Sequence, residues 1–216
     1  MYPICLSTKG EHITSYNSFK DNFLKICSSH YKDGRALCFA FILYRERDAQ
    51  IRSTLFNTDR WDALDDISGK YFTVFSFLVP ERVNHYMNPI AHRRRLKPSD
   101  ASDLMLKKYF NLSGENAYPS ILFFQVKNRS IIDSFIVPLK EREDQKAFEE
   151  IRDIMELAER TLKITKFDGK NHQEIFNQVR GAIDHKFAIK GLLDGAKKIG
   201  GIIRFIAPLR HFFGSV

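Results

Sequence analysis

The sequence predicts an α/β protein: a mixed sheet of parallel strands plus a C-terminal antiparallel hairpin, with helices on both faces, followed by an α-helical basic tail. Three observations support this fold class. Two short apolar stretches, residues 36–44 and 71–79, have the character of strands buried on both faces. Helical periodicity precedes the first stretch and separates the two. Two further strand-like stretches, residues 117–126 and 130–137, are joined by a tight turn, which predicts a hairpin.

Amphipathic periodicity predicts the helices in order. Residues 15–32 carry apolar side chains at helical spacing, and Asp33-Gly34 ends that pattern. Residues 45–68 continue it more weakly, and we expect a break near residues 57–59. The helix that follows the strand at 71–79 is expected only after an irregular, proline-containing segment.

That later helix is predicted over residues 101–110, with Ser99 or Asp100 as its cap, and a strongly periodic helix is predicted over residues 141–160. Because the first three strands alternate with helices, we expect them to pair in parallel through right-handed crossovers. A further strand, at residues 3–6 or 11–14, could pair at the edge of the sheet.

The distribution of charge separates the predicted α/β region from the C-terminal part of the chain. We expect a domain over residues 1–162 and a basic amphipathic helical extension over residues 163–216. The extension contains ten Lys and Arg against four acids, which is +6, and this leaves +2 of the total net charge of +8 for the rest. A localised cationic segment favours an anionic partner, although a solvated basic face would look the same.

One local order resembles the thioredoxin family. It consists of Leu106-Lys-Lys-Tyr-Phe110, then Tyr118-Pro119-Ser-Ile-Leu-Phe-Phe124, then a turn and the strand at 130–137. It is similar to that family's helix, cis-proline, strand and hairpin. The resemblance implies that residues 1–162 form a thioredoxin-like domain in which the Tyr118–Pro119 peptide bond is cis. A trans proline at a strand start is the alternative.

The family's redox dithiol is missing. In the thioredoxin family it follows the strand that residues 36–44 match, and here that place reads Tyr44-Arg45-Glu46-Arg47-Asp48. Thiol–disulfide exchange needs a thiolate at a helix N-terminus, and Cys38 would lie in mid-strand. We therefore expect a non-catalytic binding module without a cofactor, which recognises a protein partner or a second copy of itself. The expected contact residues are Tyr44, Arg45, Glu46, Tyr118 and Pro119.

The remaining cysteines and the histidines give no metal or disulfide pattern. Cys5, Cys27 and Cys38 are an odd number without metal-ligand spacing, which favours a reducing, cytoplasmic setting. No two histidines stand four residues apart, so we expect no metal site. The first residues lack the basic and apolar regions of a signal peptide.

Acidic residues leave an enzyme of unassigned class as one alternative. Glu46 and Asp48 follow the first predicted strand, and four further carboxylates surround Trp61: Asp59, Asp62, Asp65 and Asp66. Such groups can bind Mg²⁺ or act as acid and base, but a run of this kind is more often a solvated helix face. Catalysis would require a pocket lined by at least two of them.

Nucleic-acid binding is a second alternative, through a basic loop and the tail. The loop contains His92 and then Arg93, Arg94, Arg95 and Lys97, and the forked guanidinium groups of the arginines suit phosphate recognition. No nucleic-acid-binding signature accompanies it. An exposed loop that pairs locally with acids is equally consistent with the pattern.

The tail is the stronger functional indication. Apolar residues recur on one helical face, at Ile189, Leu192, Ala196, Ile199, Ile203 and Ile206. Basic residues occupy the rest: Lys186, Lys190, Lys197, Lys198 and Arg204. This pattern is typical of helices that lie in an anionic membrane interface. The apolar face could instead pack on the domain, on a second copy or on a partner subunit, so peripheral membrane association remains one of two interpretations.

Overall fold

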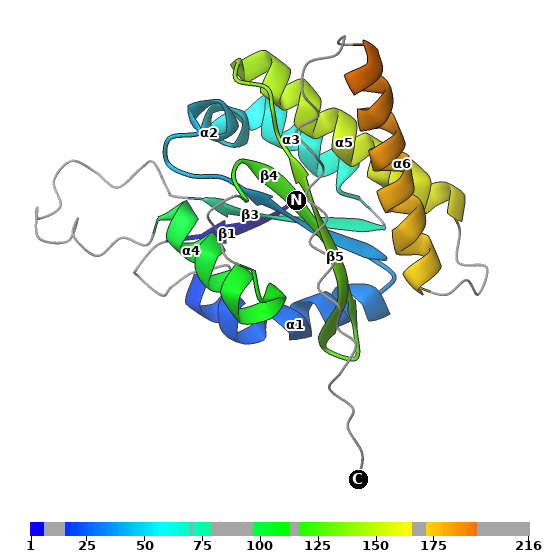
Figure 1. Ribbon diagram of the computed structural model, residues 1–216. Coiled ribbons are helices and arrows are strands. Elements are labelled where there is room, and N and C mark those ends of the chain that lie inside the picture. Colours follow the sequence, from blue (N-terminus) through cyan, green and yellow to red (C-terminus); the bar gives the residue numbers. More distant parts are fainter. Residues whose placement is uncertain (7–15, 70, 79–96, 113–116, 166–171, 194–216) are drawn as a thin grey trace, which may run out of the picture.

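The structure is a computed structural model of the chain, and it describes residues 1–6, 16–69, 71–78, 97–112, 117–165 and 172–193 (Figure 1). These residues form a mixed α/β fold around a five-stranded sheet. The strands are β1 (Tyr2–Cys5), β2 (Cys38–Leu43), β3 (Phe72–Leu78), β4 (Ser120–Lys127) and β5 (Ser130–Pro138). The helices are α1 (Tyr16–Lys32), α2 (Ala49–Phe56), α3 (Thr58–Ile67), α4 (Pro98–Met105), the π-helical turn η2 (Leu106–Phe110), α5 (Asp144–Thr165) and α6 (His172–Leu193).

The strand order is β1-β3-β2-β4-β5, and only its first half is parallel. Strands β1, β3 and β2 pair in parallel, which confirms the predicted edge strand and the predicted pairing of the two apolar stretches. The expectation that the third predicted strand is also parallel is wrong, because β4 runs antiparallel to β2, with Leu43 opposite Ser120. A helix between two strands gives a parallel pair only when it carries the chain back to the end of the sheet at which the first strand began. The connection through α4 and η2 instead delivers β4 at the end where β2 and β3 finish.

Local sequence determines most element ends. Asn57 separates α2 from α3, and its side chain accepts a hydrogen bond from the Arg60 N–H at 3.0 Å, as the predicted break requires. The β4–β5 turn places both Asn128 and Arg129 at positive φ, which is the geometry of the tightest hairpins. The Tyr118–Pro119 peptide bond is cis, as the resemblance implied.

Helix α4 begins earlier than predicted. Neither Ser99 nor Asp100 is its cap: Lys97 is the N-cap and Pro98 the first helical residue. Proline suits that position because its φ is already helical and its missing N–H is not needed there. Asp100 still contributes, since its carboxylate accepts from the Lys97 N–H at 3.4 Å.

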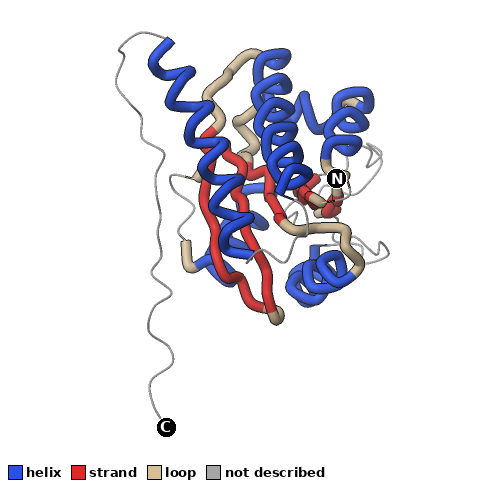
Figure 2. Tube along the Cα trace, turned by 90° about the vertical axis from the view of Figure 1, so that its right-hand side faces the viewer, coloured by secondary structure: helices blue, strands red, loops and turns tan. Residues whose placement is uncertain are grey.

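Two apolar cores lie on opposite faces of the sheet. Helices α1 and α4 with η2 cover one face, and α2, α3, α5 and α6 cover the other (Figures 1 and 2). Successive residues of a strand point to opposite faces, so β2 contributes Phe39 and Phe41 to the first core and Ala40 and Ile42 to the second. Both predicted apolar strands are therefore buried on both sides.

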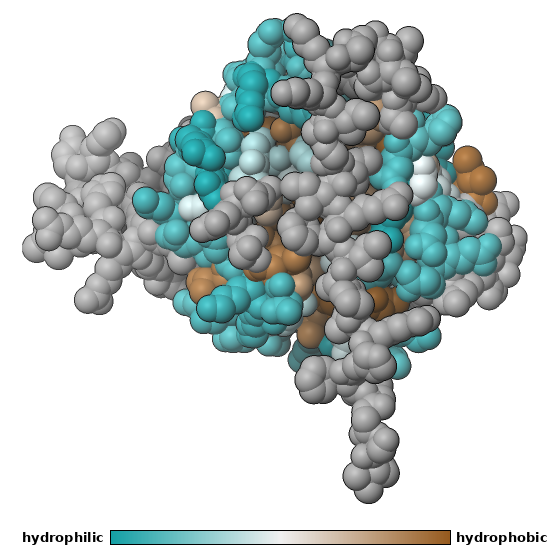
Figure 3. Space-filling model, viewed as in Figure 1, coloured by the Kyte–Doolittle hydropathy of each residue, from teal (hydrophilic) through white to brown (hydrophobic). Residues whose placement is uncertain are grey.

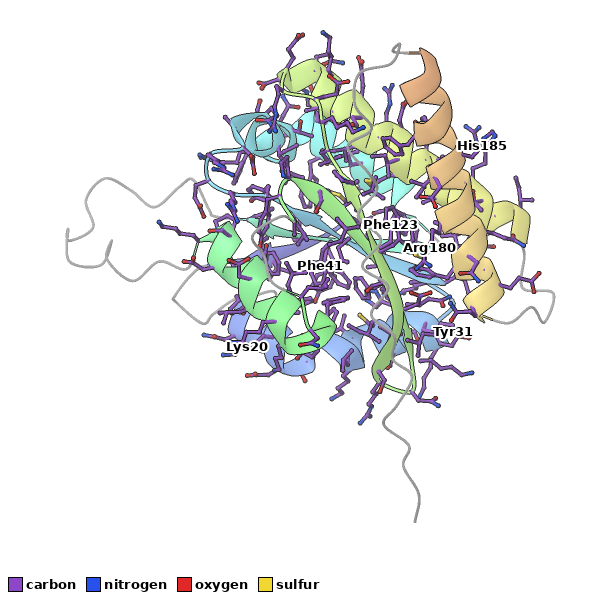
Figure 4. All side chains as sticks on the ribbon, viewed as in Figure 1. Lys20, Tyr31, Phe41, Phe123, Arg180 and His185 are labelled. Atoms are coloured by element: carbon purple, nitrogen blue, oxygen red, sulfur yellow. The ribbon has the colours of Figure 1, made fainter. Side chains whose placement is uncertain are left out.

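Helix α6 is docked on the domain over its first four turns. Four of its side chains are buried in the same core as α5: Ile175, Phe176, Val179 and Ile183. Arg180 donates to the Asp133 carboxylate of β5 at 2.8 Å, and its guanidinium lies 5.1 Å from the Phe135 ring centroid (Figure 4). The boundary expected at residue 162 falls inside α5. Of the predicted tail stripe, the side chains of Ile189 onward lie outside the described residues.

We predict that the Arg180→Met substitution lowers the free energy of unfolding by about 1–3 kcal/mol, because it removes a charge-assisted hydrogen bond from a half-buried carboxylate while keeping the apolar stem. Urea unfolding measures the change, and hydrogen exchange should show lost protection in α6. Lys186→Met is the matched control, since it breaks the more exposed Lys186–Asp153 pair of the same helix and should cost less than about 1 kcal/mol. Equal costs for the two variants would contradict this account of α6 docking.

Candidate functional site

The candidate site lies at the carboxyl ends of β2 and β3. The chain leaving β2 enters α2 on one face of the sheet, whereas the chain leaving β3 leads to α4 on the other face. Open α/β sheets bind ligands outside the carboxyl ends of strands whose connections diverge in this way, which makes this end of the sheet the candidate site. The predicted contact segment, residues 44–48, follows β2 at this point.

Arg45 and Tyr118 are in direct contact, although 73 positions separate them in the sequence. The Arg45 guanidinium carbon lies 4.8 Å from the centre of the Tyr118 ring. The Tyr118 hydroxyl donates to Asp103 Oδ1 of α4 at 2.6 Å. Burial, together with this hydrogen bond, raises the pKa of Tyr118 well above its usual value, so the hydroxyl remains a neutral donor. The three side chains form one polar chain that joins the loop after β2, the residue before Pro119 and α4.

A second contact joins the loop after β2 to the start of α4. The Ser99 hydroxyl lies 3.0 Å from Glu46 Oε1 and 3.1 Å from Oε2, and donates to this carboxylate. The Ser99 N–H also points to Glu46, at 3.4 Å. Glu46 thus contacts the first turn of α4 from outside the helix, and the helix dipole favours a carboxylate at that position. Glu46 is exposed, so its carboxylate remains accessible to a partner.

The other predicted contact residues, Tyr44 and Pro119, are buried and do not form part of the exposed contact surface. Tyr44 is buried and its hydroxyl donates to the Phe77 carbonyl, which joins the ends of β2 and β3. Pro119 is also buried. Asp48 is only 4% exposed and accepts from the Arg45 N–H at 2.7 Å, which fixes the turn. Of the predicted set, the solvent-accessible part of the site is therefore built from exposed Glu46 and half-buried Arg45 and Tyr118.

Sequence reasoning missed Ser99 and Asp103 as members of the site. They stand four residues apart on α4, so they share one face of that helix, and this face meets Glu46 and Tyr118. Their spacing was visible in the sequence. What the sequence could not give was the position of α4 beside the loop after β2.

The predicted anion-binding residues are only partly described. Lys97 is exposed at the start of α4, close in the chain to Ser99. Lys190 lies within α6, but its side chain is outside the described residues. Arg93, Arg94, Arg95, Lys197, Lys198 and Arg204 also lie outside them.

The acidic residues do not converge on one place. Asp62, Asp65 and Asp66 are exposed on α3, and Asp65 pairs with the Met1 amine. Within the described part of the chain, no three His, Cys, Asp or Glu side chains are arranged as metal ligands. A cavity of 330 Å³ lies among the described residues near Met1, and none of the acids named as catalytic candidates lines it.

The two described thiols are buried in the cores. Cys27 of α1 and Cys38 of β2 are free and fully buried. Burial raises the pKa of both thiols, because a thiolate would lose its hydration there. Neither side chain can supply a thiolate at neutral pH, which agrees with the lack of cysteine in residues 44–48.

Similarity to known proteins gives no information about the function of this chain. No protein-family model, curated protein or solved structure matches the chain. The described helices include none with both the length and the apolar character needed to cross a bilayer. We therefore infer function from the contacts of the described residues.

We predict that iodoacetamide alkylates Cys27 and Cys38 of the folded protein at least about 100-fold more slowly than free thiols at about pH 8.5, since each unit of raised pKa lowers the thiolate fraction tenfold. Mass spectrometry in a Cys5→Ser background measures this, and the urea-unfolded protein is the control that should react at both positions. Linkage adds a second expectation. The unfolded state ionises its thiols first, so the free energy of unfolding should fall as pH rises above about 8.5. Rapid native alkylation of Cys38 would contradict both.

Proposed function

We propose that this chain is a thioredoxin-like domain without redox chemistry that binds a partner protein or a second copy of itself, and that its basic C-terminal region associates with a partner subunit or an anionic membrane surface. The observation that carries the proposal is the contact network at the carboxyl end of β2. It joins Arg45 to Tyr118 and Glu46 to Ser99 across three segments distant in sequence.

The order of elements supports the thioredoxin-like assignment. Helix α4 with η2 is followed by the proline-led strand β4, the hairpin to β5 and the closing helix α5, which is the order on which the resemblance rests. The parallel strands β1, β3 and β2 precede it, with α1 and α2–α3 on opposite faces. The absence of cysteine after β2 and the burial of Cys27 and Cys38 favour a function other than thiol exchange.

The network supports binding because it is preorganised. Arg45, Glu46 and Tyr118 each have a fixed partner, so less side-chain entropy is lost when a second protein docks. Among the described atoms visible in Figure 3, hydrophilic residues predominate and hydrophobic residues form small groups. Leu104, which follows Asp103 on α4, is 52% exposed and adds an accessible apolar side chain to this helix. Recognition through charged groups with one apolar anchor fits a transient protein interface.

We predict that a photocrosslinking residue, p-benzoylphenylalanine, placed at Leu104 forms a discrete adduct in cells that express the full chain. Arg45→Asp should reduce that adduct about tenfold or more, because it reverses a charge at the centre of the network. Gel mobility and mass spectrometry measure the adduct. The purified chain, irradiated alone, distinguishes a second copy from a different protein, since only self-association gives an adduct of twice the mass.

The same residue placed at Ile164 is the matched control for that experiment. Ile164 is 77% exposed on α5, away from the site, and should give no discrete adduct. Equal adducts at both positions, or an adduct at Leu104 that Arg45→Asp leaves unchanged, would remove the network as the binding surface. Absence of any adduct at Leu104 would contradict the proposal as a whole.

The tail proposal concerns the residues beyond the docked part of α6. Buried contacts and the Lys186–Asp153 pair fasten that helix as far as Phe187. Residues 188–216 then contain five Lys and Arg against Asp194 alone, together with the predicted apolar stripe. Each basic residue near an anionic membrane contributes about 1 kcal/mol of binding free energy.

We predict that the full chain floats with vesicles containing phosphatidylserine and stays in the bulk phase with neutral phosphatidylcholine vesicles. A variant with Lys190, Lys197, Lys198 and Arg204 changed to Gln should bind anionic vesicles about 100-fold or more weakly, because it lacks four attractive charges. Arg142→Gln, in the exposed loop before α5, is the control that should float normally. If the unaltered chain stays in the bulk phase on anionic vesicles, the membrane form of the proposal is wrong and the partner-subunit form remains.

A further inference from the structure

A cavity of 330 Å³ lies at the amino-terminal ends of β1 and β3, so it is at the other end of the strands from the candidate site. Its walls come from the start of β1, the end of α1, the turn after α3 and the start of β3. The lining residues are Met1, Tyr2, His30, Arg35, Ser68, Gly69 and Thr73. The volume is at the lower end of the range for small-molecule sites, so it admits a compound of a few heavy atoms beyond a single ion.

The polar lining of this cavity is cationic or neutral. Arg35 is exposed, and among the described residues its guanidinium makes no ion pair. His30 Nδ1 lies 3.2 Å from the Thr73 hydroxyl, and the Tyr2 ring packs against the imidazole edge-on. The Met1 amine is engaged by Ser68 and Asp65. An unpaired guanidinium beside an oriented imidazole is a donor set that suits a tetrahedral oxyanion.

We propose that this cavity binds the phosphate group of a small phosphorylated compound, with Arg35 as the principal anion ligand and His30 as a second donor. The Arg35 fork provides paired N–H donors, which suit phosphate geometry. Thr73 holds the imidazole through Nδ1, so Nε2 is the nitrogen left to donate. The remaining volume, beside the Tyr2 ring, accommodates the organic part of the compound.

Charge around His30 couples the site to pH. Burial first, and then the Arg35 charge, lower the pKa of His30, whereas Asp33 acts in the opposite direction. Across the cavity, burial lowers the pKa of the Met1 amine to about 5, and the Asp66 charge acts in the opposite direction. The carboxylate of Asp65 contacts that amine, while Tyr2 and Thr73 contribute no charge at neutral pH. A bound dianion offsets the Arg35 charge and favours the imidazolium. Anion binding should therefore raise the His30 pKa, and by linkage the anion should bind more tightly as pH falls through that pKa.

The test is an NMR titration of the imidazole signals of the full chain with sulfate, whose charge stays constant between about pH 5 and pH 8, unlike that of phosphate. We expect the His30 signals, assigned with His30→Gln, to shift saturably and the affinity to be higher at about pH 6 than at about pH 8. Arg35→Met should weaken binding about tenfold or more, because it removes a charge-assisted hydrogen bond. Arg142→Met should leave binding unchanged.

Two further arms complete the design. Ribose 5-phosphate should bind more tightly than inorganic phosphate, which would assign the rest of the cavity to the organic part. Inorganic phosphate binding as tightly as ribose 5-phosphate would overturn the assignment to a phosphorylated compound. A linear, unsaturated response of His30 to sulfate, or an equal response in Arg35→Met, would overturn the site itself. Arg35 is exposed, so its substitution leaves the fold intact.

Discussion

The packing of Phe41 at the centre of β2 is the contact on which the rest of the structure depends. Its ring stacks on Phe77 of β3 at 5.5 Å and on Phe124 of β4 at 5.4 Å, so it joins the parallel and antiparallel halves of the sheet. Phe19 of α1 and Phe110 of η2 meet the same ring edge-on. Aromatic pairs of this kind contribute about 0.5–1.5 kcal/mol each beyond their buried area. Because four elements converge on one side chain, this face of the sheet fixes the position of β2 relative to both neighbouring strands.

A fixed β2 gives the loop that follows it a fixed origin. Tyr44 hydrogen-bonds the carbonyl of Phe77 at the end of β3, and Asp48 accepts from the Arg45 N–H, so the chain between them has little freedom. Arg45 and Glu46 therefore leave the sheet in set directions, and each meets a side chain from another element. The charged surface is thus a consequence of the aromatic core below it. A domain with a loosely packed β2 could have the same residues in this loop without presenting them together.

Local sequence patterns were sufficient to predict most helices and strands, but they were insufficient to predict how these elements are arranged in space. The apolar stretches, the break at Asn57 and the hairpin follow from period, turn residues and length, all of which act over a few positions. The direction of β4 depends on where a long connection returns, which no local pattern encodes. Ser99 and Asp103 were missed for the same reason, since the partner of Ser99 is 53 residues away and that of Asp103 is 15 residues away. The expected boundary at residue 162 followed charge, whereas Ile175 and Phe176 show that apolar burial continues into α6.

The two ends of the sheet carry different chemistry, and the sheet keeps them independent. The carboxyl end presents paired charges of both signs, whereas the amino end has an unpaired guanidinium over a cavity. Strand β3 separates them by its seven residues, or about 20 Å at the usual rise. That distance exceeds the screening length of about 8 Å at physiological salt, so a charge at one end has little electrostatic effect at the other. Along β3, mechanical coupling would pass through Val74 and Phe75, which are fully buried in packed cores. Cores of this density resist small displacements, so a substitution at Arg35 and one at Arg45 should act additively on stability and separately on binding.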